Sequence, residues 1–151
     1  MVKIASSIEI HRPAAEVFNF ITASANDFEW QYGTLGSGRI SEGAAGVGGS
    51  FRTVGHLMGR RVVSTFEITE YDSNRQYGFR SMTGPLVSHT LYTLEGTRHR
   101  TRIKVVTQAS PDEASTQPGK VMEKYMQREL KDNLAMLKIV MEGVAVTAEL
   151  R

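Results

Sequence analysis

The sequence predicts an α+β fold in which a curved antiparallel β-sheet of six to seven strands packs against one long C-terminal helix. Three observations predict this class. The first strand is followed by two short helices, a run of strands with tight turns fills the middle of the chain, and a long amphipathic helix comes last. A run of strands followed by a helix is typical of an antiparallel sheet with helices on one face.

The chain has 151 residues, a formal net charge of +2 at pH 7 and no cysteine. This length suits a single domain over residues 1–151 that builds its core without disulfides. The missing cysteines exclude thiol catalysis and cysteine metal sites. No stretch approaches the roughly 18 apolar residues of a membrane span, and the N-terminus lacks the apolar core of a signal peptide. We therefore expect a cytoplasmic monomer or homodimer without stable membrane insertion.

The spacing of apolar residues predicts the first strand and the short helices that follow it. Apolar residues alternate with polar ones over residues 2–11, which predicts a strand with one buried face. Pro13 suits the first turn of a helix, because its missing N–H would have no partner there. The apolar side chains that follow predict a short helix over 13–23, and residues 26–30 predict a second short helical turn.

Residues 33–50 hold seven of the fourteen glycines, which predicts loops and sharply bent strand ends. Glycine-rich segments also bind phosphates. However, Gly36-Ser-Gly38 is followed by Ser41 where a dinucleotide-binding motif needs its third glycine, and no Gly-Lys-Ser/Thr follows a glycine run. Nucleotide-binding motifs are therefore excluded.

The middle of the chain predicts an antiparallel meander, because apolar and polar residues alternate and short turns separate the runs. The expected strands are 50–58, 60–71, 76–83, 86–95 and 99–108. The last of them places basic residues on one face and apolar residues on the other. This basic face also fits an anionic partner, but we expect a solvated sheet face and no nucleic-acid binding; its residues are Arg98, Arg100, Arg102 and Lys104, with Arg60 and Arg61 nearby.

A polar loop at 109–117 precedes the C-terminal helix. Pro118 is expected to open the helix, which runs to about Glu142, and Gly143 is a plausible stop. A helix of this length spans about 37 Å and must cross the whole sheet. Its apolar residues fall on one stripe, formed by Met122, Met126, Leu130, Leu134, Leu137, Val140, Met141 and Val144.

Several stretches resemble those of a known family. They are residues 10–18 (IHRPAAEVF), 47–49 (VGG), 66–72 (FEITEYD), 83–85 (TGP) and 92–98 (YTLEGTR). In this order, they resemble the START/SRPBCC superfamily, the helix-grip fold of birch-pollen-allergen-type proteins, and most closely its polyketide cyclase/dehydrase-like branch. The resemblance covers about residues 2–142.

This resemblance implies a cavity between the sheet and the C-terminal helix that holds a hydrophobic small molecule. Members of the superfamily bind lipids, sterols, polyketides or plant hormones, and a minority cyclise or dehydrate a bound polyketide. The family shares no catalytic residues, so none is carried over to this chain, and no cofactor is expected. We expect a binding protein rather than an enzyme, with polyketide cyclisation or dehydration as the alternative.

The candidate ligand-binding residues combine large apolar side chains with hydroxyl groups on the inward strand faces. Buried hydroxyls need partners, and a cavity that orients a ligand uses a few of them. The alternative is an ordinary core in which serine and threonine bond to the backbone. The candidates are Trp30, Phe51, Ser64, Phe66, Phe79, Ser81, Leu86, Ser88, Thr90, Tyr92, Met122, Met126, Asn133 and Leu137.

Four positions in or beside this set leave alternatives open. Asn133 lies within the apolar stripe of the helix, so its amide either joins a structural network or faces the ligand. Tyr125 and Glu129 flank the stripe and either reach the cavity edge or stay solvated. Trp30 either forms an end wall of the cavity or anchors the glycine-rich loop to the core.

Catalytic candidates are few. The four histidines lack the spacing of a metal site, so no metal is expected, and the sequence has no Gly-x-Ser-x-Gly. A cyclase would need a group that polarises a carbonyl, such as a tyrosine inside the cavity. Arg52, His56 and Arg80 are further candidates, and the alternation of strand residues places His89 outside.

Overall fold

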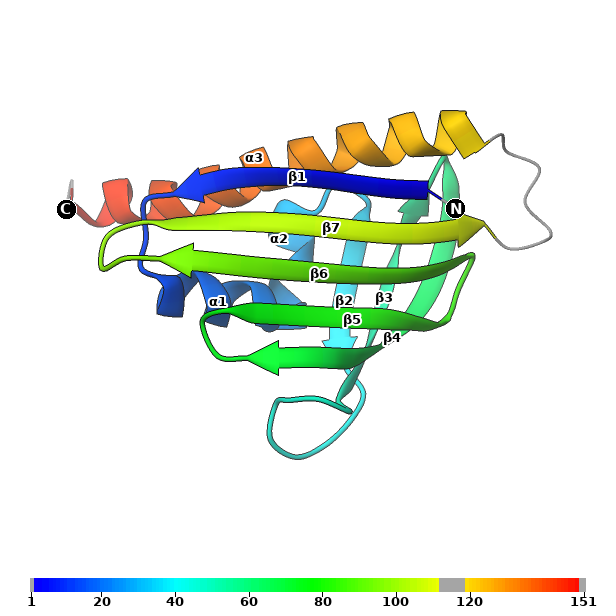
Figure 1. Cartoon of the computed structure of the whole chain (residues 1–151), viewed down its shortest axis with the longest axis horizontal. Coiled ribbons are helices and arrows are strands. Elements are labelled where there is room, and N and C mark those ends of the chain that lie inside the picture. The colour runs from blue at the N-terminus through cyan, green and yellow to red at the C-terminus, as the bar shows by residue number, and fades with distance from the viewer. Residues whose placement is uncertain (1, 112–118, 150–151) are drawn as a thin grey trace.

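The computed structural model describes residues 2–111 and 119–149. Its elements follow the predicted order (Figure 1). They are β1 (Val2–Ile10), α1 (Ala14–Thr22), the 3-10 turn η1 (Ser24–Asn26), α2 (Asp27–Trp30), β2 (Thr34–Arg39), β3 (Ser50–Leu57), β4 (Arg60–Asp72), β5 (Gln76–Thr83), β6 (Leu86–Gly96), β7 (Thr101–Pro111) and α3 (Gly119–Glu149).

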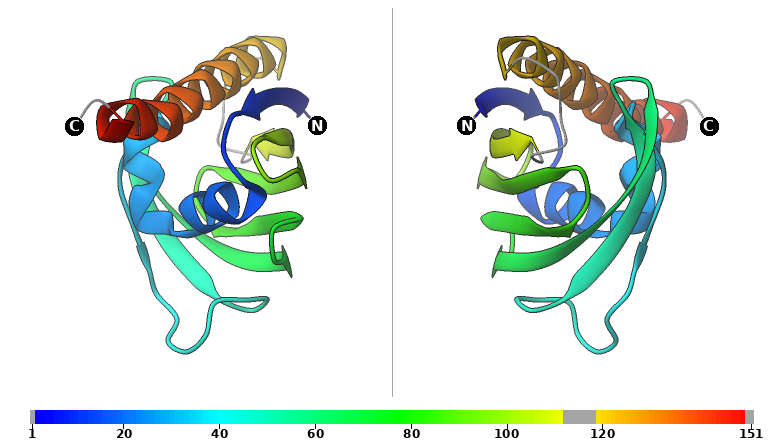
Figure 2. Two further views of the ribbon diagram at one scale, coloured as in Figure 1. Left: turned by 90° about the vertical axis from the view of Figure 1, so that its left-hand side faces the viewer. Right: turned by 90° about the vertical axis from the view of Figure 1, so that its right-hand side faces the viewer.

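The strands form one seven-stranded antiparallel sheet in the order β1-β7-β6-β5-β4-β3-β2. Strands β2 to β7 are a meander, and β1 returns to pair with β7, with Val2 opposite Ala109 and Ile10 opposite Thr101. Register shifts in β2 and β4 mark irregular pairing, which bends strands locally. The sheet curves around α1, and α3 lies across its open side (Figure 2). The predicted fold class is confirmed.

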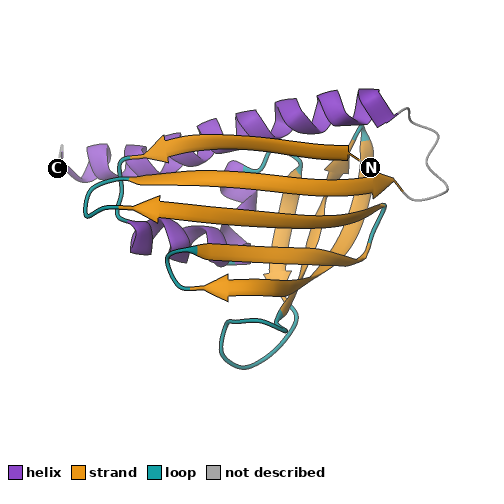
Figure 3. Cartoon of the chain, viewed as in Figure 1, coloured by secondary structure: helices purple, strands orange, loops and turns teal. Residues whose placement is uncertain are grey.

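The long helix α3 covers the exposed edge of β1 (Figure 3). An edge strand has backbone groups without strand partners, which can pair with other chains. The Gln127 side chain hydrogen-bonds to two of these backbone groups. Its Nε2 donates to the Ala5 carbonyl at 2.8 Å, and its Oε1 accepts from the Ala5 amide at 3.3 Å. Further along, Lys138 Nζ donates to the Glu9 carbonyl at 2.7 Å. The helix is therefore docked on β1 by polar contacts as well as by its apolar stripe.

The predicted dry and wet faces of β7 are confirmed. Thr101, Ile103 and Val105 are buried, whereas Arg102 and Lys104 are exposed. The core between the sheet and the helices is rich in aromatic rings. Phe51 stacks on Phe66, and the ring centroids are 5.2 Å apart. On α3, Met122, Leu134 and Leu137 of the predicted stripe are buried in the core.

Three element boundaries differ from the prediction. β7 begins at Thr101 and runs to Pro111. It extends beyond the expected end because β6 pairs with residues 109–111 on one side and β1 pairs with Ala109 on the other. β2 occupies part of the glycine-rich segment, where we expected loops and strand ends. α3 continues past Gly143, which was wrongly expected to end it. One glycine costs a helix only about 1 kcal/mol, and no proline follows. Pro118 lies outside the described residues.

Candidate functional site

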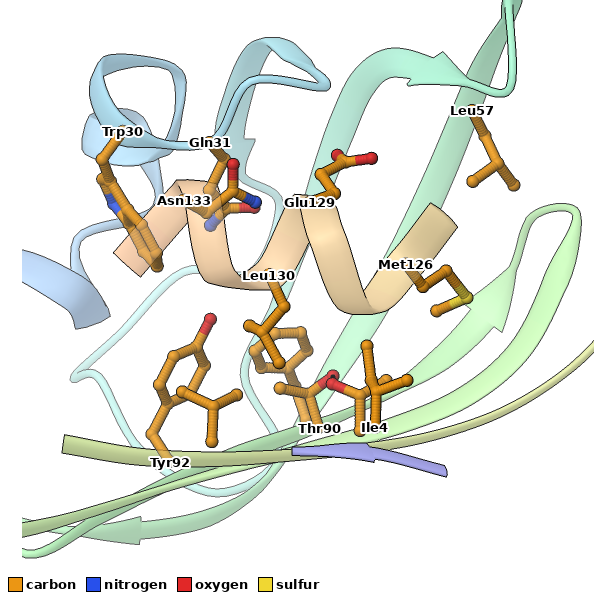
Figure 4. A pocket seen from close by; sticks show the side chains of 13 residues that line it. Ile4, Trp30, Gln31, Leu57, Thr90, Tyr92, Met126, Glu129, Leu130 and Asn133 are labelled. Carbon is orange, nitrogen blue, oxygen red and sulfur yellow. Dashed lines mark hydrogen bonds between the residues drawn. The ribbon is translucent and has the colours of Figure 1, made fainter. Parts of the chain in front are cut away.

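A cavity of about 200 Å³ lies between the sheet, α2 and α3. Most of its lining is apolar, and a few polar groups face it from both the strands and the helix (Figure 4). This composition is that of small-molecule sites. The lining side chains are Ile4, Trp30, Gln31, Leu57, Phe79, Thr90, Tyr92, Val105, Thr107, Met126, Glu129, Leu130 and Asn133.

The sheet supplies the floor of the cavity through alternate residues of adjacent strands. Thr90 and Tyr92 come from β6, and Val105 and Thr107 are their direct neighbours on β7. The hydroxyls of Thr90 and Thr107 are 2.9 Å apart and hydrogen-bond to each other. These two hydroxyls therefore share one hydrogen bond, in which one is the donor, and the proton of the other hydroxyl remains available to a further acceptor.

Tyr92 is the main polar group on the floor. Its ring rises from the sheet with the hydroxyl directed toward α3 (Figure 4). Burial raises the pKa of Tyr92 far above its usual value, and the nearby charges of Asp27 and Tyr77 raise it further. The hydroxyl therefore stays protonated and can donate a hydrogen bond into the cavity.

Asn133 serves both of the roles that the sequence left open. Its Oδ1 accepts a hydrogen bond from the Tyr32 backbone amide at 2.9 Å, which ties α3 to the segment after α2. The residue is only 9% exposed and also lines the cavity. Its Nδ2 has no hydrogen-bond partner among the described residues, so two N–H donors remain for a ligand.

Trp30 closes one end of the cavity and contacts Tyr92 edge-to-face, with 6.4 Å between the ring centroids. It is 2% exposed, so it is an end wall and also part of the core. Within the described part of the chain, its Nε1 is the one buried side-chain nitrogen or oxygen without a hydrogen-bond partner. A buried donor without a partner is unfavourable, and only a few such groups occur in native proteins.

Glu129 is the charged residue of the lining. Burial is the main cause that raises its pKa, while hydrogen bonds from the Tyr125 hydroxyl and the Gly33 amide oppose the shift and Asp132 adds to it. Gly33 is required at its position, because a Cβ there would lie 2.5 Å from Glu129 Oε1 and 2.9 Å from the His56 carbonyl oxygen. Glu129 was considered a flanking residue from the sequence, and the structure places it in the lining.

Asp27 is a buried carboxyl group that the sequence did not single out. It is 6% exposed, and burial raises its pKa to about 7, while a hydrogen bond with Ser37 opposes the shift. A second cavity, of about 340 Å³, is lined in part by Ala25, Phe51 and Tyr77. The charge of Asp27 raises the pKa of Tyr77, which lines this second cavity, and of Tyr92, which lines the first.

The structure brings six of the predicted ligand-binding residues together around the first cavity. These are Trp30, Phe79, Thr90, Tyr92, Met126 and Asn133. Phe51 lines the second cavity instead.

The other seven predicted residues line neither of the two cavities. Met122 and Leu137 are buried in the core, and Phe66 and Leu86 pack against it. Three serines belong to the surrounding strands: Ser81 accepts a hydrogen bond from the Ser88 amide at 2.8 Å, and Ser64 lies beside Gly84.

The arginine and histidine candidates for catalysis do not line the cavity. Arg52 and His56 are exposed on β3, and Arg80 pairs with Glu67 at 2.9 Å. Because side chains alternate along a strand, these residues lie on the other face of the sheet from Phe51 and Phe79 and point away from the core. His89 also lies on this face, as predicted, with its Nε2 3.1 Å from a Glu70 carboxylate oxygen.

Sequence reasoning missed several lining residues. Thr107 and Val105 share the inward face with Ile103, and Leu130 belongs to the helical stripe, so the pattern could have identified them. Gln31 and Leu57 lie at the ends of short elements, where no periodicity indicates a direction.

A curved antiparallel sheet that grips a long C-terminal helix, with an apolar cavity between them, defines a START-like domain. The chain belongs to the family described as polyketide cyclase / dehydrase and lipid transport, which matches it over residues 1–142. No curated protein is significantly similar to it in sequence.

Solved structures share this fold at low sequence identity. A START superfamily protein from Mycobacterium smegmatis has a TM-score of 0.82 at 13% identity, and the match covers 94% of this chain and 98% of that one. The Zhui aromatase/cyclase from Streptomyces sp. R1128 has a TM-score of 0.75 at 14% identity, with 99% and 95% covered. The di-domain ARO/CYC BexL matches with a TM-score of 0.75 at 16% identity, over 94% of this chain and 47% of that protein. At these identities, the similarity shows the fold alone.

The described residues contain no group of three or more histidine, aspartate and glutamate side chains that could hold a metal ion. None of their helices is long and apolar enough to cross a membrane.

Proposed function

We propose that the protein binds a hydrophobic small molecule in the cavity between the sheet and α3. The observation that carries this proposal is the combination of apolar walls with unpaired polar atoms. Phe79, Val105 and Leu130 supply apolar surface, whereas Asn133 Nδ2 has no partner in the described chain. A core built only for stability would leave neither the space nor the unpaired donor.

The cavity size limits the ligand. A dry engineered cavity of roughly 150 Å³ binds benzene, and drug-sized ligands need about 300 Å³ or more. A volume of about 200 Å³ therefore suits one aromatic ring with a short chain, or a similar lipid or polyketide fragment. A larger ligand would require the cavity to extend toward its neighbour, which Phe51 and Tyr77 line.

Filling the cavity tests the proposal. Leu130→Trp adds bulk to a lining residue of α3, whereas Ile139→Trp adds the same bulk to the same helix at a position 65% exposed. Native mass spectrometry should detect a co-purifying apolar molecule, or one added from a lipid and polyketide panel, on the parent chain and on Ile139→Trp. We expect at least about tenfold weaker binding to Leu130→Trp, because the larger side chain fills the space that the ligand would occupy. Equal binding to the two variants would place the ligand elsewhere.

A cyclase or dehydratase is the second candidate function, and Tyr92 is the observation that favours it. Its protonated hydroxyl faces the cavity and can polarise a ligand carbonyl, while Glu129 in the same lining can accept a proton. Tyr92→Phe should then abolish turnover of a linear aromatic-polyketide mimic while the mimic still raises the melting temperature. Turnover that survives in Tyr92→Phe would rule out this role for the hydroxyl.

A further inference from the structure

The lining of the first cavity contains an acidic side chain and no basic one. Among its thirteen residues, Glu129 is the only ionisable acid or base apart from the phenol of Tyr92, and no lysine, arginine or histidine is present. The second cavity differs, because Arg39 contributes to its lining. A fatty acid or another carboxylate would thus meet no cation in the first cavity.

The Glu129 carboxylate has no cationic partner within the described chain. The groups that face it are the Tyr125 hydroxyl, the Gly33 amide and the neighbouring acid Asp132. The Tyr125 hydroxyl and the Gly33 amide are neutral hydrogen-bond donors, which stabilise a carboxylate less than an ion pair does. The charge of Glu129 is therefore available to a ligand in the cavity.

Asp27 is a second buried carboxyl group, on the short helix α2 that also carries Trp30 of the lining. Ser37 is its hydrogen-bonding neighbour, and Tyr77 and Tyr92 are the ionisable groups close enough to sense its charge. The single Ser37 hydroxyl proton has another acceptor, the Arg52 carbonyl oxygen at 3.1 Å. In the part of the chain that the structure describes, no ion pair forms at Asp27. Buried carboxylates without a cation are costly, so a bound cation would relieve this cost.

Aromatic rings complete the surroundings. Trp30, Tyr92 and Phe79 line the cavity. The ring centroid of Tyr92 lies 6.4 Å from that of Trp30 and 6.2 Å from that of Phe79. The faces of such rings attract cations, most strongly when water is excluded. Aromatic walls with nearby carboxylates form an environment that favours a positively charged group on an apolar body.

We propose that the cavity beneath α3 selects ligands that carry a cationic amine on an apolar body, with Glu129 and Asp27 supplying the negative charge. This inference rests on the proposed function, because it specifies the ligand class of the same cavity. Neutral analogues bind more weakly, and carboxylates of the same skeleton are rejected.

The proposal predicts a direction of pH dependence. Burial raises the pKa of both carboxyl groups, so acid protonates them and removes the charge that attracts the amine. An alkyl amine has a pKa of about 10 and stays charged through this range. Affinity for an amine therefore rises between pH 5 and pH 8, while affinity for a neutral analogue does not.

Three probes with one skeleton test the proposal on the full chain: 3-phenylpropylamine, 3-phenylpropan-1-ol and 3-phenylpropanoate. Trp30 reports on binding, because it lines the cavity and is the only tryptophan in the sequence. Titrations followed by its fluorescence should give an affinity for the amine at least about tenfold higher than for the alcohol at pH 8, as expected for a charged hydrogen bond. The carboxylate should bind more weakly than the alcohol.

Two charge-neutralising substitutions and one control complete the test. Combined Asp27→Asn and Glu129→Gln should reduce the preference for the amine to within about threefold of the alcohol. Glu123→Gln removes a carboxylate from the exposed face of α3 and should keep the preference. Circular dichroism verifies that each variant is folded.

The possible failures are distinguishable. An alcohol that binds as tightly as the amine, or a preference for the amine that survives in the double variant, would overturn the amine inference and leave the proposed function standing. Absence of binding by all three probes to the folded parent chain would contradict both.

Discussion

Asp27 shows at the residue scale how position changes the chemistry of a side chain. An exposed aspartate has a pKa near 3.8, and burial at the start of α2 raises that of Asp27 to about 7. The folded protein therefore binds this proton more tightly than the unfolded chain. The corresponding stability is present below about pH 4 and is lost as the pH rises through 7.

Replacing Asp27 with asparagine removes this pH dependence. Asp27→Asn keeps the shape of the protonated acid, so its stability should be close to that of the parent chain at pH 4. At pH 8 it should exceed that of the parent by about 2 to 4 kcal/mol, since each pKa unit corresponds to about 1.4 kcal/mol. Urea denaturation at both pH values measures the difference. Asp72→Asn, at an exposed position, is the control; an unchanged difference for Asp27→Asn between pH 4 and pH 8 would contradict the prediction.

The sequence identified some site residues and not others for physical reasons. Asn133 was detectable because a polar residue interrupts a long apolar stripe. Asp27 was not, because a helix of four residues is too short for a periodic pattern to show which side is buried. Arg52 and His56 were ambiguous, because a register shift in the neighbouring strand can change which face a residue occupies.

At the scale of elements, the segment between α2 and β2 is fixed to α3 from two sides. The Tyr32 amide donates to Asn133, and the Gly33 amide donates to Glu129. The same two helix residues line the cavity. Docking of this segment and the shape of the cavity therefore depend on each other.

A single methyl group at Gly33 should disturb this contact. In Gly33→Ala the Cβ would overlap the Glu129 carboxylate and the His56 carbonyl oxygen, so we expect a loss of about 1–3 kcal/mol of stability. Gly36→Ala is the matched control on β2, because nothing lies within 4 Å of its Cβ. Thermal unfolding of both variants measures the effect. Equal melting temperatures would mean that the segment is free to shift away from α3.

The sequence predicted the apolar stripe of α3 better than it predicted the end of this helix. The apolar stripe of α3 was predicted because it repeats over many turns, and its buried residues confirm it. The end of the helix was not, since Gly143 is a weak stop signal without a following proline. Contacts such as Gln127 with Ala5 join residues 122 positions apart, and no local pattern indicates them.

At the scale of the whole molecule, the order of strands and helices was enough to predict the fold class, and the resemblance of several sequence stretches indicated the family. The cavity was predicted as a consequence of that family, and its lining combines residues from β1, β3, β5, β6, β7, α2 and α3. The elements that form the cavity are therefore the ones that form the fold. Ligand binding should stabilise the whole sheet and helix together, because it ties these elements to one another.

The central claim is that a small apolar molecule binds inside this cavity. The most direct measurement is nuclear magnetic resonance of the labelled protein during titration with 3-phenylpropan-1-ol, a neutral probe that does not depend on the amine inference. We expect the largest shifts at lining residues such as Thr90, Tyr92 and Leu130, together with the Trp30 indole N–H. Shifts confined to the exposed face of α3, around Lys124 and Arg128, or no saturable shifts at all, would contradict it.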